Sequence, residues 1–262
     1  MKPLAALTPT EANQLRGLLF DLDDTVLDDG RLGEEAYSAL FRLREAGLLL
    51  IAVTGRPASW AELIARQWPV DAAIAENGPI GWFNDGPRVA RFDSVDVDER
   101  DRRAARLAEL VEDLRRALPA LTPADDVNGR LTDFAFDINE HQRASEELVA
   151  QAVARGRVAG AATFRSSVHL HFTFDRLDKA TGVLRYLRQH HSVDPTAARR
   201  LFAFIGDSEN DAPCFATFRT TIAVANLRGR PTIGPRFITE APKGRGFAEA
   251  ARALVRLRLS AG

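Results

Sequence analysis

A short apolar run that ends in closely spaced aspartates constrains the fold of this chain most. Residues 17–20 read Gly-Leu-Leu-Phe, and Asp-Leu-Asp-Asp-Thr follows at positions 21–25. A run without polar alternation is typical of a strand that is buried on both faces, as in a parallel sheet covered by helices. Alternation along an extended chain places the side chains of Asp21 and Asp23 on the same side. Residues at the carboxyl end of such a strand lie at the edge where open α/β sheets bind ligands.

The same pattern of an apolar run followed by a helical segment recurs along the chain. Gly47 marks the end of a predicted helix, and Gly55 marks the end of the apolar run 48–53. Between the apolar runs lie segments with apolar residues at helical spacing. This alternation predicts an α/β protein with a Rossmann-like parallel-sheet core. The predicted strands are 17–20, 48–53, 72–75, 201–205, 221–225 and 237–239, and the main predicted helices are 34–46, 57–67, 179–190 and 246–259.

The middle of the chain breaks this rhythm. Two strand-like stretches flank Asn84-Asp85-Gly86-Pro87, which indicates a hairpin. We therefore predict an inserted α+β cap domain at residues 85–172, which selects the substrate, and a catalytic core made of residues 1–84 and 173–262. Within the predicted cap the pattern indicates a charged helix over 95–118, a strand over 133–138, a helix over 141–155 and further strands over 161–174.

Charge and composition narrow the class of partner. The chain has 35 basic and 36 acidic residues, so its net charge gives no reason to expect binding to nucleic acid or to an anionic membrane. We find neither a secretory signal nor a membrane span at the amino terminus, and the single cysteine, Cys214, excludes an internal disulfide framework. We expect a cytoplasmic protein without a nucleic-acid or membrane partner, and the sequence leaves the oligomeric state open.

Polar residues from four segments converge on one expected sheet edge. Two crowded carboxylates repel each other unless a cation or a proton relieves the repulsion. Mg²⁺ suits a site with few carboxylates plus water and phosphate oxygens, and a lysine with hydroxyl donors can neutralise a phosphoryl group. The combination predicts Mg²⁺-assisted chemistry on a phosphate ester. The converging residues are Asp21, Asp23, Thr54, Arg56, Lys179, Asp207 and Asp211.

The order of these motifs resembles the haloacid dehalogenase superfamily of aspartate-nucleophile phosphatases. The family motifs run D-x-D-x-T, a strand-end Thr or Ser, a Lys, and G-D-x-x-N-D. The inserted segment resembles the α+β cap of class IIB members, which include sugar-phosphate, sucrose-phosphate and mannosyl-phosphoglycerate phosphatases, and Glu76-Asn77-Gly78 fits that subgroup. The matching segments are Asp21-Leu-Asp23-Asp-Thr25, Thr54-Gly-Arg56, Lys179 and Gly206-Asp207-Ser-Glu-Asn210-Asp211.

The resemblance implies a role for each motif residue. Asp21 would attack phosphorus to form an aspartyl-phosphate, and Asp23 would protonate the leaving alkoxide and later activate water. Thr54 and Lys179 would bind the transferring phosphoryl group. The metal site would comprise Asp21, a backbone carbonyl near Asp23, and Asp207, with Asn210 and Asp211 arranged around it; the remaining candidate substrate contacts are Thr25, Gly55, Arg56, Asn77, His169 and His171.

Two readings of the cap histidines stay open. His169 and His171 are two residues apart on a predicted strand, so both face one side, where they contact a substrate or a metal, or else belong to a half-exposed sheet face. The leading hypothesis for the whole chain is a Mg²⁺-dependent phosphatase that acts on a small phosphomonoester, such as a sugar phosphate or a phosphorylated sugar derivative. The alternatives are a phosphosugar mutase, in which the phospho-aspartate returns its phosphoryl group to another hydroxyl, and a non-catalytic sensor of a phosphate ligand.

Overall fold

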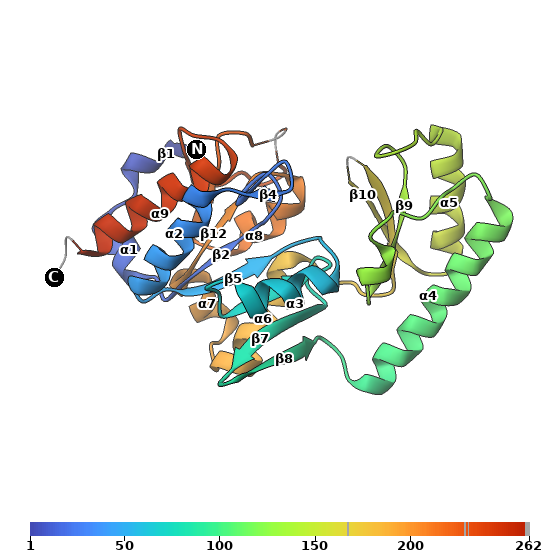
Figure 1. The fold of residues 1–262 in the computed structure, drawn as a ribbon, viewed down its shortest axis with the longest axis horizontal. Helices are drawn as coiled ribbons and strands as arrows, with labels where there is room; N and C mark the ends of the chain where they lie inside the picture. The colour runs from blue at the N-terminus through green and yellow to red at the C-terminus, as the bar shows by residue number, and fades with distance from the viewer. Residues whose placement is uncertain (167, 228, 230, 260–262) are drawn as a thin grey trace.

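One large sheet organises most of the molecule (Figure 1). The structure is a computed structural model that describes residues 1–166, 168–227, 229 and 231–259. All neighbouring strands from β1 to β6 in the sheet order pair in parallel, whereas β7 and β8 form an antiparallel hairpin at one edge. The sheet order in the described chain is β1 (Lys2–Pro3), β14 (Phe237–Ile238), β13 (Thr220–Ala223), β12 (Phe202–Gly206), β2 (Gly17–Phe20), β5 (Leu49–Val53), β6 (Ala72–Ala75), β7 (Ile80–Asp85) and β8 (Arg88–Asp93).

Helices cover both faces of this sheet, which confirms the predicted α/β class. Leu18 and Phe20 of β2 pack on one face, and Leu19 packs on the other, so every side chain of this strand meets a hydrophobic layer. This double burial explains why the strand shows no polar alternation. The first face is covered by α1 (Pro9–Gln14), α2 (Glu34–Glu45), α3 (Ala58–Gln67) and α9 (Lys243–Leu259), and the second by α6 (Lys179–His191), α7 (Pro195–Leu201) and α8 (Ala212–Thr217).

A smaller three-stranded sheet lies in the inserted segment. Its order is β10 (Ala162–Arg165), β11 (His169–Thr173) and β9 (Asp133–Asp137), and all pairs are antiparallel. Phe136 and Phe172 point to the face covered by α4 (Val97–Ala117) and α5 (Glu146–Val158). In Figure 1 these two helices lie on the side turned away from the large sheet, so the other face of the small sheet is turned toward it. The small sheet, α4, α5 and the loops that connect them are called the cap below.

The connections between the cap and the large sheet are tied together by one buried arginine. Arg100 of α4 contacts Asp93 at 2.8 Å and Asp175 at 2.6 Å. Asp93 is the last residue of β8, where the chain leaves the large sheet, and Asp175 lies in the returning connection. The division at residues 85 and 172 stays a prediction. Because β8 pairs within the large sheet as far as Asp93, sheet membership favours a cap that starts after this residue.

The structure differs from the sequence-based expectation at the start of α5. We expected this helix from residue 141, but it begins at Glu146, after Ser145 as its N-cap. The Asp137 carboxylate accepts hydrogen bonds from the backbone N–H groups of residues 139–142, which holds this stretch in a turn. Helix α7, strand β1 and the short hairpin of β3 (Leu27–Asp28) and β4 (Arg31–Leu32) were also not predicted.

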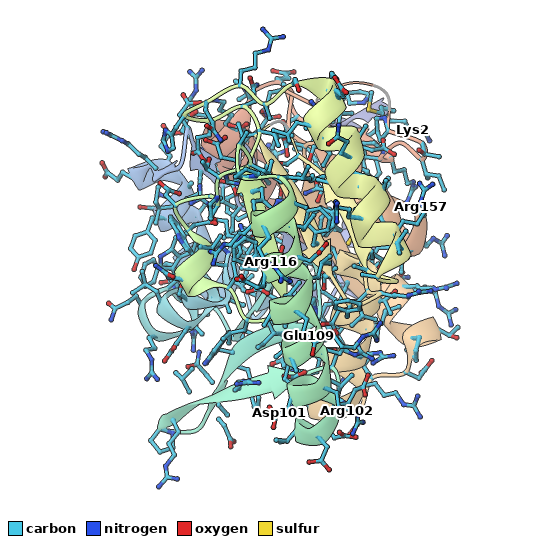
Figure 2. The ribbon with its side chains drawn as sticks, turned by 90° about the vertical axis from the view of Figure 1, so that its right-hand side faces the viewer. Lys2, Asp101, Arg102, Glu109, Arg116 and Arg157 are labelled. Atoms are coloured by element: carbon cyan, nitrogen blue, oxygen red, sulfur yellow. The ribbon has the colours of Figure 1, made fainter. Side chains whose placement is uncertain are left out.

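The outer face of the cap is charged. Figure 2 shows α4 running across the front of the molecule, with Asp101, Arg102, Glu109 and Arg116 projecting from it. Arg102 pairs with Glu99 and Arg116 with Glu112, as expected for a solvated helix face. Among the helices in the described parts of the chain, none is long and apolar enough to cross a membrane.

Candidate active site

Strand ends bring the predicted catalytic residues to one edge of the large sheet. Asp21 directly follows β2, Asp207 follows β12, and these two strands are neighbours. Lys179 opens α6 and is fully buried; its Nζ lies 2.7 Å from Asp21 Oδ1 and 2.8 Å from Asp211 Oδ1. The first, third and fourth motifs of the sequence therefore meet through one ammonium group.

This part of the site carries an excess of negative charge. Asp21, Asp207 and Asp211 are buried and offer oxygen atoms that all lie within 4.8 Å of one another. Burial raises the pKa of Asp21 well above its usual range, and burial together with the charge of Asp211 raises the pKa of Asp207 to about 7. Three carboxylates share one lysine, so a hard divalent cation with oxygen ligands fits the site.

Asp211 organises the loop that carries Asp207. Its Oδ2 accepts hydrogen bonds from the backbone N–H groups of Asp207 at 2.9 Å and Ser208 at 3.2 Å, while its Oδ1 accepts from Lys179. Asn210 lies in the same loop, but its side chain is exposed and its amide oxygen accepts from the Ser208 hydroxyl at 2.6 Å. Asp211 is thus in direct contact with the buried site, whereas Asn210 lies at its rim.

The Asp23 carboxylate pairs with Arg56, in the loop after β5. Arg56 Nε lies 2.9 Å from both Asp23 oxygens, and the guanidinium carbon lies 3.9 Å from the centre of the Trp60 ring. Half of the Asp23 side chain is exposed. Thr54 is fully buried, and its hydroxyl accepts a hydrogen bond from the Arg56 N–H at 3.1 Å. Arg56 therefore fixes Asp23 at the mouth of the site.

Two predicted substrate contacts present polar atoms that lack a protein partner. Within the described residues, the Thr25 hydroxyl and the Asn77 Oδ1 are buried without a hydrogen bond. Asn77 has a positive φ of 62° and packs beside Gly55, where a Cβ would lie 3.2 Å from its Oδ1. A buried polar atom without a partner is costly, so these two positions suit a ligand or an ordered water.

The two cap histidines lie on the same face of β11, as predicted, but both are engaged within the cap. His171 Nδ1 lies 2.8 Å from Asp133 Oδ2, and His169 Nε2 lies 2.7 Å from Glu140 Oε2. Both residues are buried, and Phe164 stacks on the His171 ring at 4.4 Å. Their contact with a substrate stays a prediction.

Asn226 is a member of the site that was not predicted from the sequence. Its amide nitrogen donates to the Asp24 carbonyl at 2.9 Å and to Asp207 Oδ2 at 3.3 Å, and its oxygen accepts from the Lys243 N–H at 2.6 Å. Asn226 follows β13 at the same edge of the sheet, so the rule that identified the other residues also covers this position.

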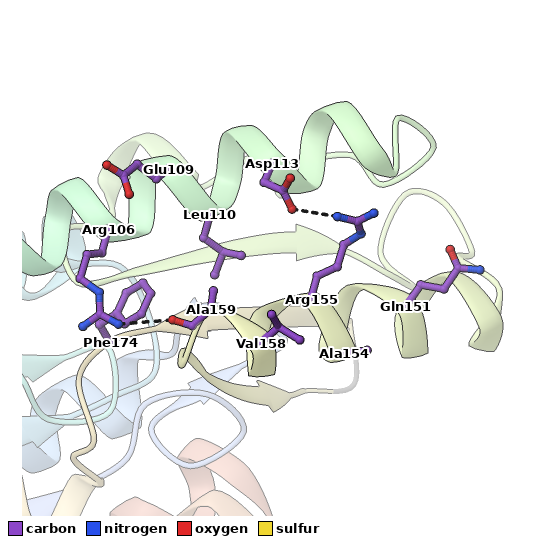
Figure 3. A pocket seen from close by; sticks show the side chains of 10 residues that line it. All are labelled: Arg106, Glu109, Leu110, Asp113, Gln151, Ala154, Arg155, Val158, Ala159 and Phe174. Atoms are coloured by element: carbon purple, nitrogen blue, oxygen red, sulfur yellow. Dashed lines mark hydrogen bonds and ion pairs between the residues drawn. The ribbon is translucent and has the colours of Figure 1, made fainter.

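A separate groove in the cap takes no part in this arrangement. It has a volume of about 760 Å³ and lies between α4 and α5, where Arg106 donates to the Ala159 carbonyl and Asp113 pairs with Arg155 (Figure 3). Because these helices cover the face of the small sheet that is turned away from the large sheet, the groove faces away from the carboxylates.

Known proteins resemble this chain in sequence and in fold. Residues 18–85 match the model of the haloacid dehalogenase-like hydrolase family. A curated phosphoglycolate phosphatase of Pyrobaculum neutrophilum is 30% identical over 239 residues, which cover 89% of this chain and 92% of that protein. A Thermoplasma acidophilum crystal structure superposes with a TM-score of 0.74 at 18% identity, over 93% of this chain and 99% of that one. The sucrose-phosphatase of Synechocystis, solved with sucrose and phosphate, gives a TM-score of 0.62 at 19% identity, over 92% and 98%.

Proposed function

Since this chain belongs to the haloacid dehalogenase-like hydrolases, we propose that it is a Mg²⁺-dependent phosphatase that hydrolyses a small phosphomonoester through an aspartyl-phosphate. The observation that carries the proposal is the buried contact between Asp21 and Lys179 inside a group of three carboxylates. A phosphomonoester would bring the negative phosphoryl group to this lysine, beside the nucleophilic oxygen.

The contacts suggest how the residues divide the work. Lys179 holds one oxygen of Asp21, which leaves the other oxygen for attack on phosphorus. The phosphoryl group moves to Asp21, and the leaving oxygen takes a proton from Asp23; water activated by Asp23 then attacks phosphorus, which releases phosphate and restores Asp21. The buried Thr54 would contribute a further contact to the phosphoryl group.

The oxygen donors present suit Mg²⁺. We propose that Asp21, Asp207 and a backbone carbonyl near Asp23 would hold the ion, because Asp211 is already engaged by Lys179 and by backbone N–H groups. When bound, the ion would neutralise charge on the phosphoryl oxygens. Asp211, together with Asn226, would keep Asp207 in position.

Two substrate classes are candidates. The motifs and the inserted segment favour a phosphorylated sugar or sugar derivative, and the curated relatives favour a phosphorylated carboxylic acid of the phosphoglycolate type. The groups that contact the leaving group would come from the cap, so its residues would choose between these classes. A phosphosugar mutase would use the same aspartate but return an isomerised sugar phosphate.

A substrate panel with and without metal tests this function. We expect release of inorganic phosphate from at least one small phosphomonoester, among them phosphoglycolate and hexose phosphates, in the presence of Mg²⁺. Chelation with EDTA should lower the rate at least about tenfold, and added Mg²⁺ should restore it. Phosphate release at the same rate with and without EDTA would contradict the metal proposal. An isomerised product would favour the mutase, and binding of the ester without turnover would favour a sensor.

Replacing Asn226 with Ala should weaken metal binding. The variant removes the hydrogen bond to Asp207, so we expect the Mg²⁺ concentration for half-maximal rate to rise about tenfold or more, as is typical when a group that orients a metal ligand is lost. Calorimetric titration of Mg²⁺ gives the affinity without catalysis. Asn84→Ala is the control, because Asn84 lies in the hairpin at the sheet edge and its side chain donates to the Val70 carbonyl at 2.8 Å. Equal Mg²⁺ affinity in both variants would contradict the assignment.

A further inference from the structure

Glu76 is a buried carboxylate that joins the large sheet to the cap. It follows β6, and only 4% of its surface is exposed. Its Oε1 accepts hydrogen bonds from the backbone N–H groups of Ala58 at 2.9 Å and Leu131 at 2.9 Å. Its Oε2 accepts from the N–H groups of Thr132 at 2.6 Å and Asp133 at 3.1 Å, and from the Thr132 hydroxyl. One donor lies at the start of α3, and the other four lie in the cap.

The arrangement specifies a carboxylate at this position. Every group around its two oxygens is a donor, and an amide would turn one N–H₂ group toward N–H groups. Burial and the neighbouring charge of Asp133 raise the pKa of Glu76 to about 7, so experiments on the ionised form belong at pH 8 or above. Hydrogen bonds to an ionised acceptor are about twice as strong as neutral ones.

Neighbouring contacts run between the same two parts. Arg130 Nη1 donates to the Gly55 carbonyl at 3.3 Å, directly between Thr54 and Arg56. A Cβ on Gly129 would overlap the Ser59 side chain at the start of α3, so the backbones approach closely there. Loop 129–133 is therefore a third attachment of the cap, besides the two chain connections that Arg100 ties together.

The attached loop leads into the strand that holds the cap histidines. Asp133 pairs with Arg130 at 3.0 Å and with His171 at 2.8 Å, and its own N–H bonds Glu76. Short contacts thus link Glu76 through Asp133 to His171, which lies on the face of the small sheet that is turned toward the large sheet. Displacing the loop at Glu76 would displace Asp133 and His171 with it.

We propose that Glu76 is a positioning residue that fixes loop 129–133 against the strand-end loops of the large sheet, and thereby sets the place of the cap over the catalytic aspartates. The inference rests on the proposed phosphatase function only in how it affects substrate. Its structural part, the attachment of the loop by Glu76, stands on the contacts alone.

Hydrogen exchange tests the attachment without any catalysis. In Glu76→Gln at pH 8, we expect the backbone amides of residues 131–133 to exchange about tenfold faster than in the wild type, because each loses an ionised acceptor. The matched control is Asp137→Asn, another buried carboxylate that accepts several backbone N–H groups, all of them within the cap. This control should leave residues 131–133 protected. Wild-type exchange at 131–133 in Glu76→Gln would overturn the proposal.

Steady-state kinetics separate positioning from a general loss of stability. For the best substrate of the panel, we expect KM of Glu76→Gln to rise about tenfold, with kcat within about threefold of the wild type. Inhibition by inorganic phosphate should stay unchanged, because phosphate needs only the residues at the edge of the large sheet. An equal rise of KM in Asp137→Asn would overturn the positioning role. If Glu76→Gln does not fold, Thr132→Val, which removes one donor from the cap side, should raise KM about threefold, and an unchanged KM would overturn the proposal.

A chain that releases no phosphate from any ester would contradict the proposed function. The exchange measurement would then still decide whether Glu76 holds the loop, so the two ideas fail separately.

Discussion

Replacing Asp21 with Asn should lower kcat for phosphomonoester hydrolysis on the order of 10⁴-fold while the protein stays folded. The change removes the oxygen that would attack phosphorus but keeps the size of the side chain. An amide oxygen can still accept from Lys179 Nζ, which lies 2.7 Å from Asp21 Oδ1 in the wild type. The measurement is phosphate release under saturating substrate, together with mass spectrometry of the quenched enzyme for a phosphorylated aspartate.

The unfolding temperature of Asp21→Asn provides a second test of this site. Asp21, Asp207 and Asp211 share one lysine, and burial with the charges of the other acidic groups raises the pKa of Asp21. Removing one of these charges relieves repulsion, so the unfolding temperature of Asp21→Asn without metal should equal or exceed that of the wild type. Asp28→Asn in the β3–β4 hairpin is the control, and it should keep most of the activity because Asp28 pairs with Lys243 outside the site. Wild-type turnover in Asp21→Asn would rule out this nucleophile.

The residues at the edge of the large sheet were predictable because one rule covers them all. Asp21, Thr54 and Asp207 each follow an apolar run, and the carboxyl ends of neighbouring parallel strands meet at one edge. Lys179 was identified through its motif, and Asp178 before it forms the N-cap of α6. The strand β2 could be predicted from composition alone, because both of its faces are buried and its apolar run is therefore continuous.

Contacts between distant segments could not be predicted from the sequence by such a rule. Glu76 belongs to the predicted Glu76-Asn77-Gly78 turn, but its four donors in the cap come from residues 131–133, and no local pattern links the two. The pairing of Asp23 with Arg56 likewise depends on how two strand-end loops meet in space. The late start of α5 has a local cause, since Asp137 offers its carboxylate to four N–H groups and competes with the helix.

Replacing Lys179 with Met should reduce both activity and stability. Lys179 is fully buried, and its removal leaves Asp21 and Asp211 without their cation. Breaking a buried ion pair from one side costs about 3–5 kcal/mol of unfolding free energy, and losing a cation from a site of developing negative charge lowers kcat by about 10²–10³-fold. Denaturant titration and phosphate release measure the two effects.

A double variant tests whether Lys179 stabilises the protein by offsetting the charges of the aspartates. If the stability loss arises from unpaired carboxylates, the double variant Lys179→Met/Asp211→Asn should recover part of the lost unfolding free energy, because it removes one of the two charges left unpaired. Activity should not recover, since the phosphoryl group would still lack its cation. Lys243→Met provides the matched control, because this lysine also faces several aspartates but does so at the surface, where solvent screens the pairs. If Lys243→Met loses as much stability as Lys179→Met, burial of the charges is not the cause of the loss. If the double variant is no more stable than Lys179→Met, Lys179 does not stabilise the protein by offsetting repulsion among the aspartates.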